Sequence, residues 1–140
     1  MAVRLSQALG VMNELSRPLA RFGSEVWLEA QLLDLLVQAR KAKDAAFRAN
    51  AKLAHSGVDY DHYIYLRVAR KQRKVWILLE RLAQRTSWLQ LSREEGILYI
   101  APSEVPVGIY AMNGEAAAAR AAAEVLNGAG IAATVDEHWR

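Results

Sequence analysis

Residues 25–55 read EVWLEAQLLDLLVQARKAKDAAFRANAKLAH, a stretch that contains neither proline nor glycine and is dominated by alanine and leucine. Both residues are strong helix formers. The apolar side chains of this stretch fall within one broad face at a helical spacing of about 100° per residue. They are Leu28, Leu32, Leu35, Leu36, Ala39, Ala46, Phe47 and Leu53. The stretch therefore predicts one long amphipathic helix, with Ser24 as a plausible N-cap.

A second long helix is predicted directly after the first. Ser56-Gly57 is typical of a helix end, because glycine readily adopts the left-handed conformation that follows the last turn. Asp59 is a suitable N-cap for a new helix. The apolar stripe of that helix is Ile64, Val68, Val75, Leu78, Leu79 and Leu82. Since the connection is short, we expect arms over 24–55 and 60–86 to form an antiparallel helical hairpin.

The region before the hairpin predicts one further helix. Leu5, Leu9, Met12 and Leu15 recur at steps of four and three, so residues 3–15 are expected to form a short amphipathic helix. Pro18 and Gly23 then predict a kink or loop. Together with the hairpin, these segments make up a predicted helical region over 1–86.

Residues 87–140 predict a small β-layer with one helix. The run Ile97-Leu98-Tyr99-Ile100 is β-branched and aromatic, which favours a strand. Residues 88–100 are therefore interpreted as a β-hairpin, although continuation of the preceding helix through 86–92 stays open. The remaining elements are a strand over 107–112, a turn at 113–114, an alanine-rich helix over 115–126 and a strand over 131–135. The predicted fold class is α+β and mostly helical, with a ββ(β)αβ layer after the hairpin.

Part of this layer resembles half of a SPOR domain, the septal peptidoglycan-binding module. The resemblance rests on Val105-Pro106-Val107-Gly108-Ile109-Tyr110, on Ala117–Leu126 and on Gly130 with residues 132–135. In that family a V-x-V-G-x-F/Y strand precedes an Ala/Leu helix, and a glycine turn leads to the next strand. The similarity covers about thirty of the 140 residues. Such a module also needs a second half-repeat and an export signal, which the sequence does not show, so its function is not carried over.

Composition restricts the classes of function. The chain has no cysteine, which excludes a disulfide scaffold, a thiolate zinc site and a thiol nucleophile. No signal peptide is evident, and the longest apolar stretch, around 32–37, is far shorter than the roughly 20 residues of a spanning helix. We find no catalytic motif, and His55, Asp59 and His62 are better explained by the turn than by a metal. The expectation is a soluble, cytoplasmic, non-catalytic protein without a cofactor or metal.

Charge is the most informative property of the sequence. Residues 36–93 carry a net charge of +9, against −1 for residues 1–35 and −5 for residues 94–140. On the second predicted helix, five basic residues lie within about 60° of one another around the axis: Arg67, Arg70, Lys74, Arg81 and Arg85. Tyr63 and Trp88 are expected at the two ends of this ridge. Arg40, Lys41 and Lys43 add positive charge on the first arm.

The ridge predicts a binding subunit whose basic helical face docks an acidic partner, with nucleic acid as the leading candidate. Lys and Arg along a helix can neutralise phosphates, and exposed aromatic rings can stack on unpaired bases. The alternative is a protein–protein adaptor or self-assembling protein in which the acidic C-terminal segment covers the ridge. Because the hairpin has more apolar length than a small β-layer can cover, we also expect two hairpins to pair in coiled-coil fashion as a homodimeric four-helix bundle.

Overall fold

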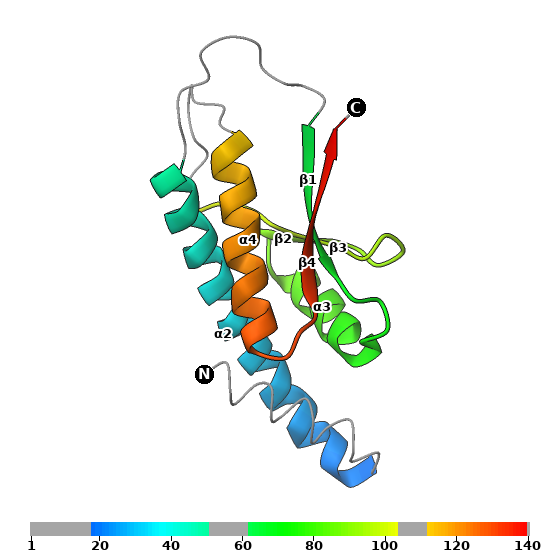
Figure 1. Ribbon diagram of the computed structural model, residues 1–140. Coiled ribbons are helices and arrows are strands. Elements are labelled where there is room, and N and C mark those ends of the chain that lie inside the picture. The colour runs from blue at the N-terminus through cyan, green and yellow to red at the C-terminus, as the bar shows by residue number, and fades with distance from the viewer. Residues whose placement is uncertain (1–17, 51–61, 104–111, 140) are drawn as a thin grey trace.

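A computed structural model describes residues 18–50, 62–103 and 112–139 of the chain (Figure 1). Its elements are, in order, α2 (Pro18–Asn50), β1 (His62–Val68), α3 (Arg73–Arg85), β2 (Leu89–Ser92), β3 (Ile97–Ile100), α4 (Met112–Gly128) and β4 (Ala133–Trp139). The helix predicted over 3–15, the helix end predicted at 56–57 and nearly all of the strand predicted over 107–112 lie outside the described residues.

The fold is α+β, as predicted, and its strands form one antiparallel sheet in the order β2-β3-β1-β4. β1 is central, with Leu66 opposite Leu98 of β3 on one side and Val135 of β4 on the other. The units β1-α3-β2 and β3-α4-β4 are interleaved, since each pair of strands encloses one strand of the other unit. This is the split β-α-β topology of ferredoxin-like folds. The described residues thus contain two strand–helix–strand units where the sequence indicated one.

The second arm of the predicted hairpin, over 60–86, is wrong for residues 62–72. Residues 62–68, HYIYLRV, form β1, and a helix begins only at Arg73. Ile64 and Val68 fit a helical stripe, but they also fit the two-residue period of a strand. Burial follows the shorter period, because Leu66 and Val68 are buried whereas Tyr65 and Arg67 are half-buried. Pairing of β1 with both β3 and β4 decides between the two periods.

The first arm is confirmed as a helix over residues 25–50, and it begins earlier than predicted. α2 begins at Pro18 and continues through Gly23, so the predicted kink or loop at 18–23 is wrong. Proline is tolerated in the first turn of a helix, where its missing N–H has no partner to lose. The predicted β-hairpin over 88–100 is confirmed as β2 and β3. α3 ends at Arg85, which rules out a helix through 86–92.

The C-terminal helix and strand both differ in extent from the prediction. α4 includes the predicted helix over 115–126 but begins at Met112, so residues 113–114 lie within a helix rather than in a turn. β4 begins at Ala133 rather than at residue 131, and it continues to Trp139. The polar residues 136–138 carry no strand signal of their own. They are in a strand because β4 pairs with β1 along its whole length, from Val68 opposite Ala133 to His62 opposite Trp139.

The three described helices share one core with the sheet. α4 packs along α2 and against β1 and β4, while α3 packs on β2 and α2 (Figure 1). Small side chains let α4 approach α2 closely, and the buried alanines of α4 are Ala116, Ala118, Ala119, Ala122 and Ala123. The stripe of α2 is at most 3% exposed at Leu28, Leu32, Leu35, Leu36 and Ala39. α3 and α4 thus cover within one chain the stripe from which two paired hairpins were expected, and the pairing of two chains stays a prediction.

Position 96, in the turn between β2 and β3, requires glycine because of both its backbone conformation and the atoms around it. Its φ of +70° is in the left-handed region, and an added Cβ would lie 3.2 Å from Arg70 Cγ and 3.2 Å from the Val68 carbonyl oxygen. We expect Gly96→Ala to lower the free energy of unfolding by about 1–3 kcal/mol. Gly128→Ala is the control, because a Cβ there meets nothing within 4 Å and should cost nothing. Urea unfolding that gives equal stabilities for the two variants would contradict this.

Candidate functional site

The predicted basic ridge is divided between three elements. Lys74, Arg81 and Arg85 lie on α3, and their spacings of seven and four residues keep them on one side of that helix. Arg81 and Arg85 are exposed, and Lys74 is half-buried. Arg67 lies instead on β1, and Arg70 lies in the turn before α3. Three residues of the ridge therefore share one side of α3, and the prediction of a single helical face for all five is wrong.

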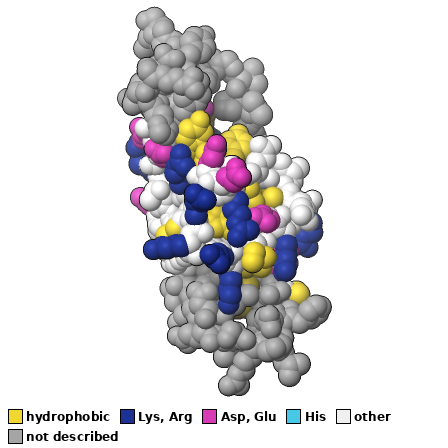
Figure 2. All heavy atoms as spheres, turned by 90° about the vertical axis from the view of Figure 1, so that its right-hand side faces the viewer, with side chains coloured by type: hydrophobic (Ala, Val, Ile, Leu, Met, Phe, Trp, Pro, Cys, Tyr) yellow, Lys and Arg dark blue, Asp and Glu magenta, His cyan; other side chains and the backbone are white. Residues whose placement is uncertain are grey.

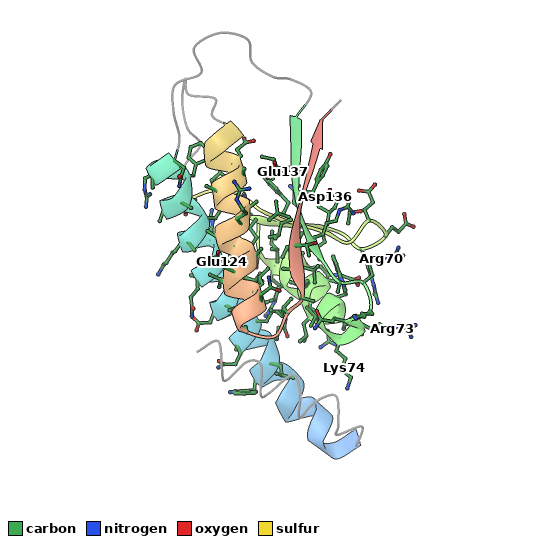
Figure 3. All side chains as sticks on the ribbon, viewed as in Figure 1. Arg70, Arg73, Lys74, Glu124, Asp136 and Glu137 are labelled. Atoms are coloured by element: carbon green, nitrogen blue, oxygen red, sulfur yellow. The ribbon has the colours of Figure 1, made fainter. Side chains whose placement is uncertain are left out.

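The densest positive charge lies in the connection from β1 to α3. We call Arg70, Lys71, Arg73 and Lys74 the basic turn. Arg70, Lys71 and Arg73 are exposed, and within the described part of the chain their side chains make no hydrogen bond or ion pair. Figure 3 shows Arg70, Arg73 and Lys74 extending away from the body of the molecule at this end. On the face seen in Figure 2, Lys and Arg side chains gather with acidic side chains between them.

Two members of the basic turn, Lys71 and Arg73, were missed in the sequence. They do not fall on the helical spacing that selected the ridge, and that spacing presupposes a helix through 62–72. The local density of basic residues could have identified them. Five of the eight residues over 67–74 are basic, and no acidic residue occurs between His62 and Leu79. A local charge run of this kind does not depend on the secondary structure.

The backbone of the basic turn is held by hydrogen bonds on several sides. The Val68 N–H donates to the Gly96 carbonyl at 2.8 Å, and the Ala69 N–H donates to the Ala132 carbonyl at 2.9 Å. Ala69 also accepts, at its carbonyl oxygen, a hydrogen bond of 3.1 Å from the indole Nε1 of the buried Trp76. The turn is therefore fixed to the turn between β2 and β3, to the connection before β4 and to the core.

Arg67, although predicted to bind, has partners within the chain. Its Nε lies 2.7 Å from Asp136 Oδ2, and its Nη1 donates to the Glu95 carbonyl. Its guanidinium also lies over the Tyr65 ring, 5.9 Å from the centroid. Arg85 forms an ion pair with Glu29 of α2. Of the predicted ridge, Arg70 is the residue whose side chain is exposed and makes no polar contact in the described part of the chain.

Arg40 and Lys43 of α2 hold the chain after β3 rather than extending the basic surface. Arg40 Nε donates to the Ala101 carbonyl at 2.9 Å, and its Nη2 donates to the Pro102 carbonyl at 3.2 Å. Lys43 Nζ donates to the Ile100 carbonyl. Since Gly96, at the opposite end of β3, contacts Arg70, these α2 residues are not brought together with the basic turn. The prediction that they bind a partner beside the ridge is therefore not supported by their position.

The other predicted site residues lie apart from the basic turn. Trp88 is half-buried, with the Arg40 guanidinium 4.9 Å from its ring centroid, so it does not end the ridge. Lys41 is exposed on α2. The side chain of Tyr63 lies outside the described residues, although its backbone belongs to β1.

Lys43 has an altered acidity because of its position between helices and sheet. Burial lowers the pKa of its ammonium group below the usual 10.5, and the nearby charge of Arg40 acts in the same direction. The carboxylates of Asp44 and Glu115 act in the opposite direction and are outweighed. The folded chain therefore releases this proton at a lower pH than the unfolded chain does.

This difference predicts a pH-dependent contribution of Lys43 to stability. Between the lowered pKa and 10.5 the unfolded state binds more protons, so the free energy of unfolding gains a positive slope with pH. Lys43→Met lacks this slope. In urea unfolding at increasing alkaline pH, we expect the stability of the wild type, relative to the variant, to rise as the pH approaches 10.5. If the free energy of unfolding changes with pH in the same way for both proteins, Lys43 has the same pKa in the folded and unfolded states.

The described residues offer few alternatives to the basic turn as a site. Among residues 18–50, 62–103 and 112–139, no group of three or more His, Asp or Glu side chains is placed to hold a metal ion. None of the described helices is long and apolar enough to cross a membrane. Comparison of the chain with family models, with curated proteins and with solved structures finds no match.

Proposed function

We propose that the chain is a non-catalytic binding subunit that docks a nucleic acid through its phosphates on the basic turn. The observation that carries the proposal is the exposure of Arg70, Lys71 and Arg73 on a backbone held by hydrogen bonds, with no acidic side chain paired to them in the described structure. Cations in such an arrangement can each neutralise a phosphate and release its condensed counterions.

The composition of the surface favours phosphate over other anions. Arginine presents a planar fork of donors that matches a phosphate oxygen pair, and two of the three exposed cations are arginines. Basic residues continue from the turn along α3, which spans about 20 Å at 1.5 Å per residue. Contacts of this kind read the backbone of a nucleic acid and carry little sequence information. The expected partner is therefore bound with low sequence specificity.

The salt dependence of binding is the primary test. Three phosphate contacts on a duplex give a slope of log K against log salt near −2.7, which is a loss of about forty-fold in affinity from roughly 50 to 200 mM salt. The experiment is an anisotropy titration of the full chain with labelled duplex DNA, single-stranded DNA and RNA at both salt concentrations. Polyglutamate of similar length is titrated in parallel.

Each outcome of this titration has a definite meaning. Affinity for nucleic acid that exceeds affinity for polyglutamate and falls steeply with salt supports the proposal. Stronger binding of polyglutamate points to an acidic protein as the partner and overturns it. Absence of binding to every oligonucleotide at about 50 mM salt also overturns it, because phosphate contacts are strongest at low salt.

A second candidate is a protein–protein adaptor whose basic surface is covered by its own acidic C-terminal segment. The observation that favours it is the ion pair of 2.7 Å between Arg67 and Asp136 of β4. Under this function the chain would associate with itself or with another protein, and the association would change little with salt. Sedimentation at roughly micromolar concentration, repeated at high salt, distinguishes a homodimer of this kind from a monomer.

A further inference from the structure

We infer that Gln72 is a positioning residue of the nucleic-acid site, an inference that rests on the proposed function. Gln72 is uncharged and lies between Lys71 and Arg73, so it separates the cations of the basic turn. Its side chain does not extend into solvent with theirs. It is half-buried and hydrogen-bonds the connection between α4 and β4.

The amide of Gln72 pairs with the backbone as a second strand would. Its Nε2 donates to the Gly130 carbonyl at 3.1 Å, and its Oε1 accepts from the Ala132 N–H at 2.9 Å. On the same segment, the Ala132 carbonyl accepts the hydrogen bond from the Ala69 N–H. The basic turn is thus joined to residues 130–132 at two points, through the backbone of Ala69 just before Arg70 and through the Gln72 side chain between Lys71 and Arg73.

This clamp determines how the cations are presented. Arg70 and Lys71 lie between the two attachment points, Ala69 and Gln72, and Arg73 follows directly. With both attachment points fixed, the backbone that carries these cations has little freedom left to lose on binding. Without the Gln72 amide, the turn would lose one of its two attachments to residues 130–132, and the freedom it gained would have to be given up when the nucleic acid binds, which reduces affinity. The cations would be unchanged in number and chemistry.

The chain contains a matched control for this clamp. Asn127, near the end of α4, also bonds backbone with both polar atoms of its amide, here at the first residue of β4. Its Nδ2 donates to the Ala133 carbonyl at 2.8 Å, and its Oδ1 accepts from the Ala133 N–H at 2.9 Å. Both clamps use the two polar atoms of one neutral amide to hold backbone at or just before the start of β4, but only Gln72 lies within the basic turn.

The experiment compares Gln72→Met with Asn127→Leu, two near-isosteric changes that remove an amide and leave the net charge unaltered. Affinity for a labelled DNA duplex is measured at about 50 mM salt and at a temperature at which both variants are folded by circular dichroism. We expect Gln72→Met to lower the affinity about tenfold and Asn127→Leu to leave it within about twofold of the wild type. If the Met variant does not fold, Gln72→Asn, which is too short to span both bonds, is measured in its place.

The outcomes separate this inference from the function on which it rests. If both variants bind the duplex as tightly as the wild type, the role of Gln72 is overturned. It is also overturned if both variants lose affinity by the same factor, because a general loss of stability acts on both clamps alike. In either case binding by the wild type would leave the proposed function standing. A wild type that binds no duplex would instead overturn the proposed function itself.

Discussion

The double variant Arg70→Glu/Arg73→Glu is expected to lose at least about 100-fold in affinity for nucleic acid at low salt. Both guanidinium groups are exposed and make no polar contact in the described structure, so the change removes two phosphate contacts. It also places two carboxylates where phosphates would approach. Removal of two contacts should make the slope of log K against log salt less negative by about 1.8 on a duplex. Anisotropy titrations at several salt concentrations measure both quantities.

Lys41→Glu/Arg48→Glu is the control for net charge. Each double variant changes four units of charge, so the net charge falls from +3 to +3 − 4 = −1 in both. Lys41 and Arg48 are exposed on the C-terminal half of α2, at the opposite side of the molecule from the turn between β1 and α3 (Figure 1). Long-range repulsion acts in both variants and is screened beyond about 10 Å at moderate salt. Similar losses in the two variants would show that net charge, rather than the basic turn, governs binding.

Trp76→Ala is expected to have the largest effect on stability. The Trp76 side chain is 0% exposed, and its Nε1–H donates to the Ala69 carbonyl at 3.1 Å. Replacing a buried tryptophan by alanine costs about 3–5 kcal/mol, which is a large part of the 5–15 kcal/mol that stabilises a typical domain. We therefore expect this variant to be partly or wholly unfolded at about 37 °C. Urea unfolding followed by circular dichroism measures the loss.

Two further variants test the physical origin of this effect. Trp76→Phe keeps most of the buried ring but leaves the Ala69 carbonyl without its indole donor, so we expect a smaller cost of about 1–2 kcal/mol. Trp27→Ala removes a tryptophan that is 46% exposed on α2 and should cost less than about 1 kcal/mol. A Trp27 variant as unstable as the Trp76→Ala variant would contradict the assignment of Trp76 to the centre of the core.

The helices that could be predicted from the sequence are those whose signal is local. Residues 25–50 combine alanine, leucine and a stripe of period 3.6, and the long run without proline or glycine leaves a helix as the natural conformation. The β2–β3 hairpin is likewise predicted by the β-branched and aromatic run over 97–100 and by Gly96 in the turn. In both cases the residues that define the element are neighbours in the chain, so no distant contact is needed to recognise it.

The region over 62–72 could not be predicted in this way, because its apolar residues satisfy two periods. Ile64 and Val68 are four residues apart, a spacing that suits one face of a helix and one face of a strand equally. Pairing with β3 and β4, which lie more than 25 residues further along the chain, selects the strand. The error spread to the site, because a helix through this region was what placed Arg67 beside Arg70 and excluded Lys71 and Arg73.

The sequence by itself determined the α+β class, the long helix α2, the hairpin of β2 and β3, the alanine-rich helix α4 and the concentration of positive charge over 36–93. The tertiary structure alone decided which of those charges face solvent. Arg40 and Lys43 belong to the same charged stretch as Arg70, yet they bind carbonyls at the end of β3 and directly after it, while Arg67 pairs with Asp136. The physical reason is that a cation binds whichever acceptor the fold brings near it, and those acceptors come from residues more than 50 positions away.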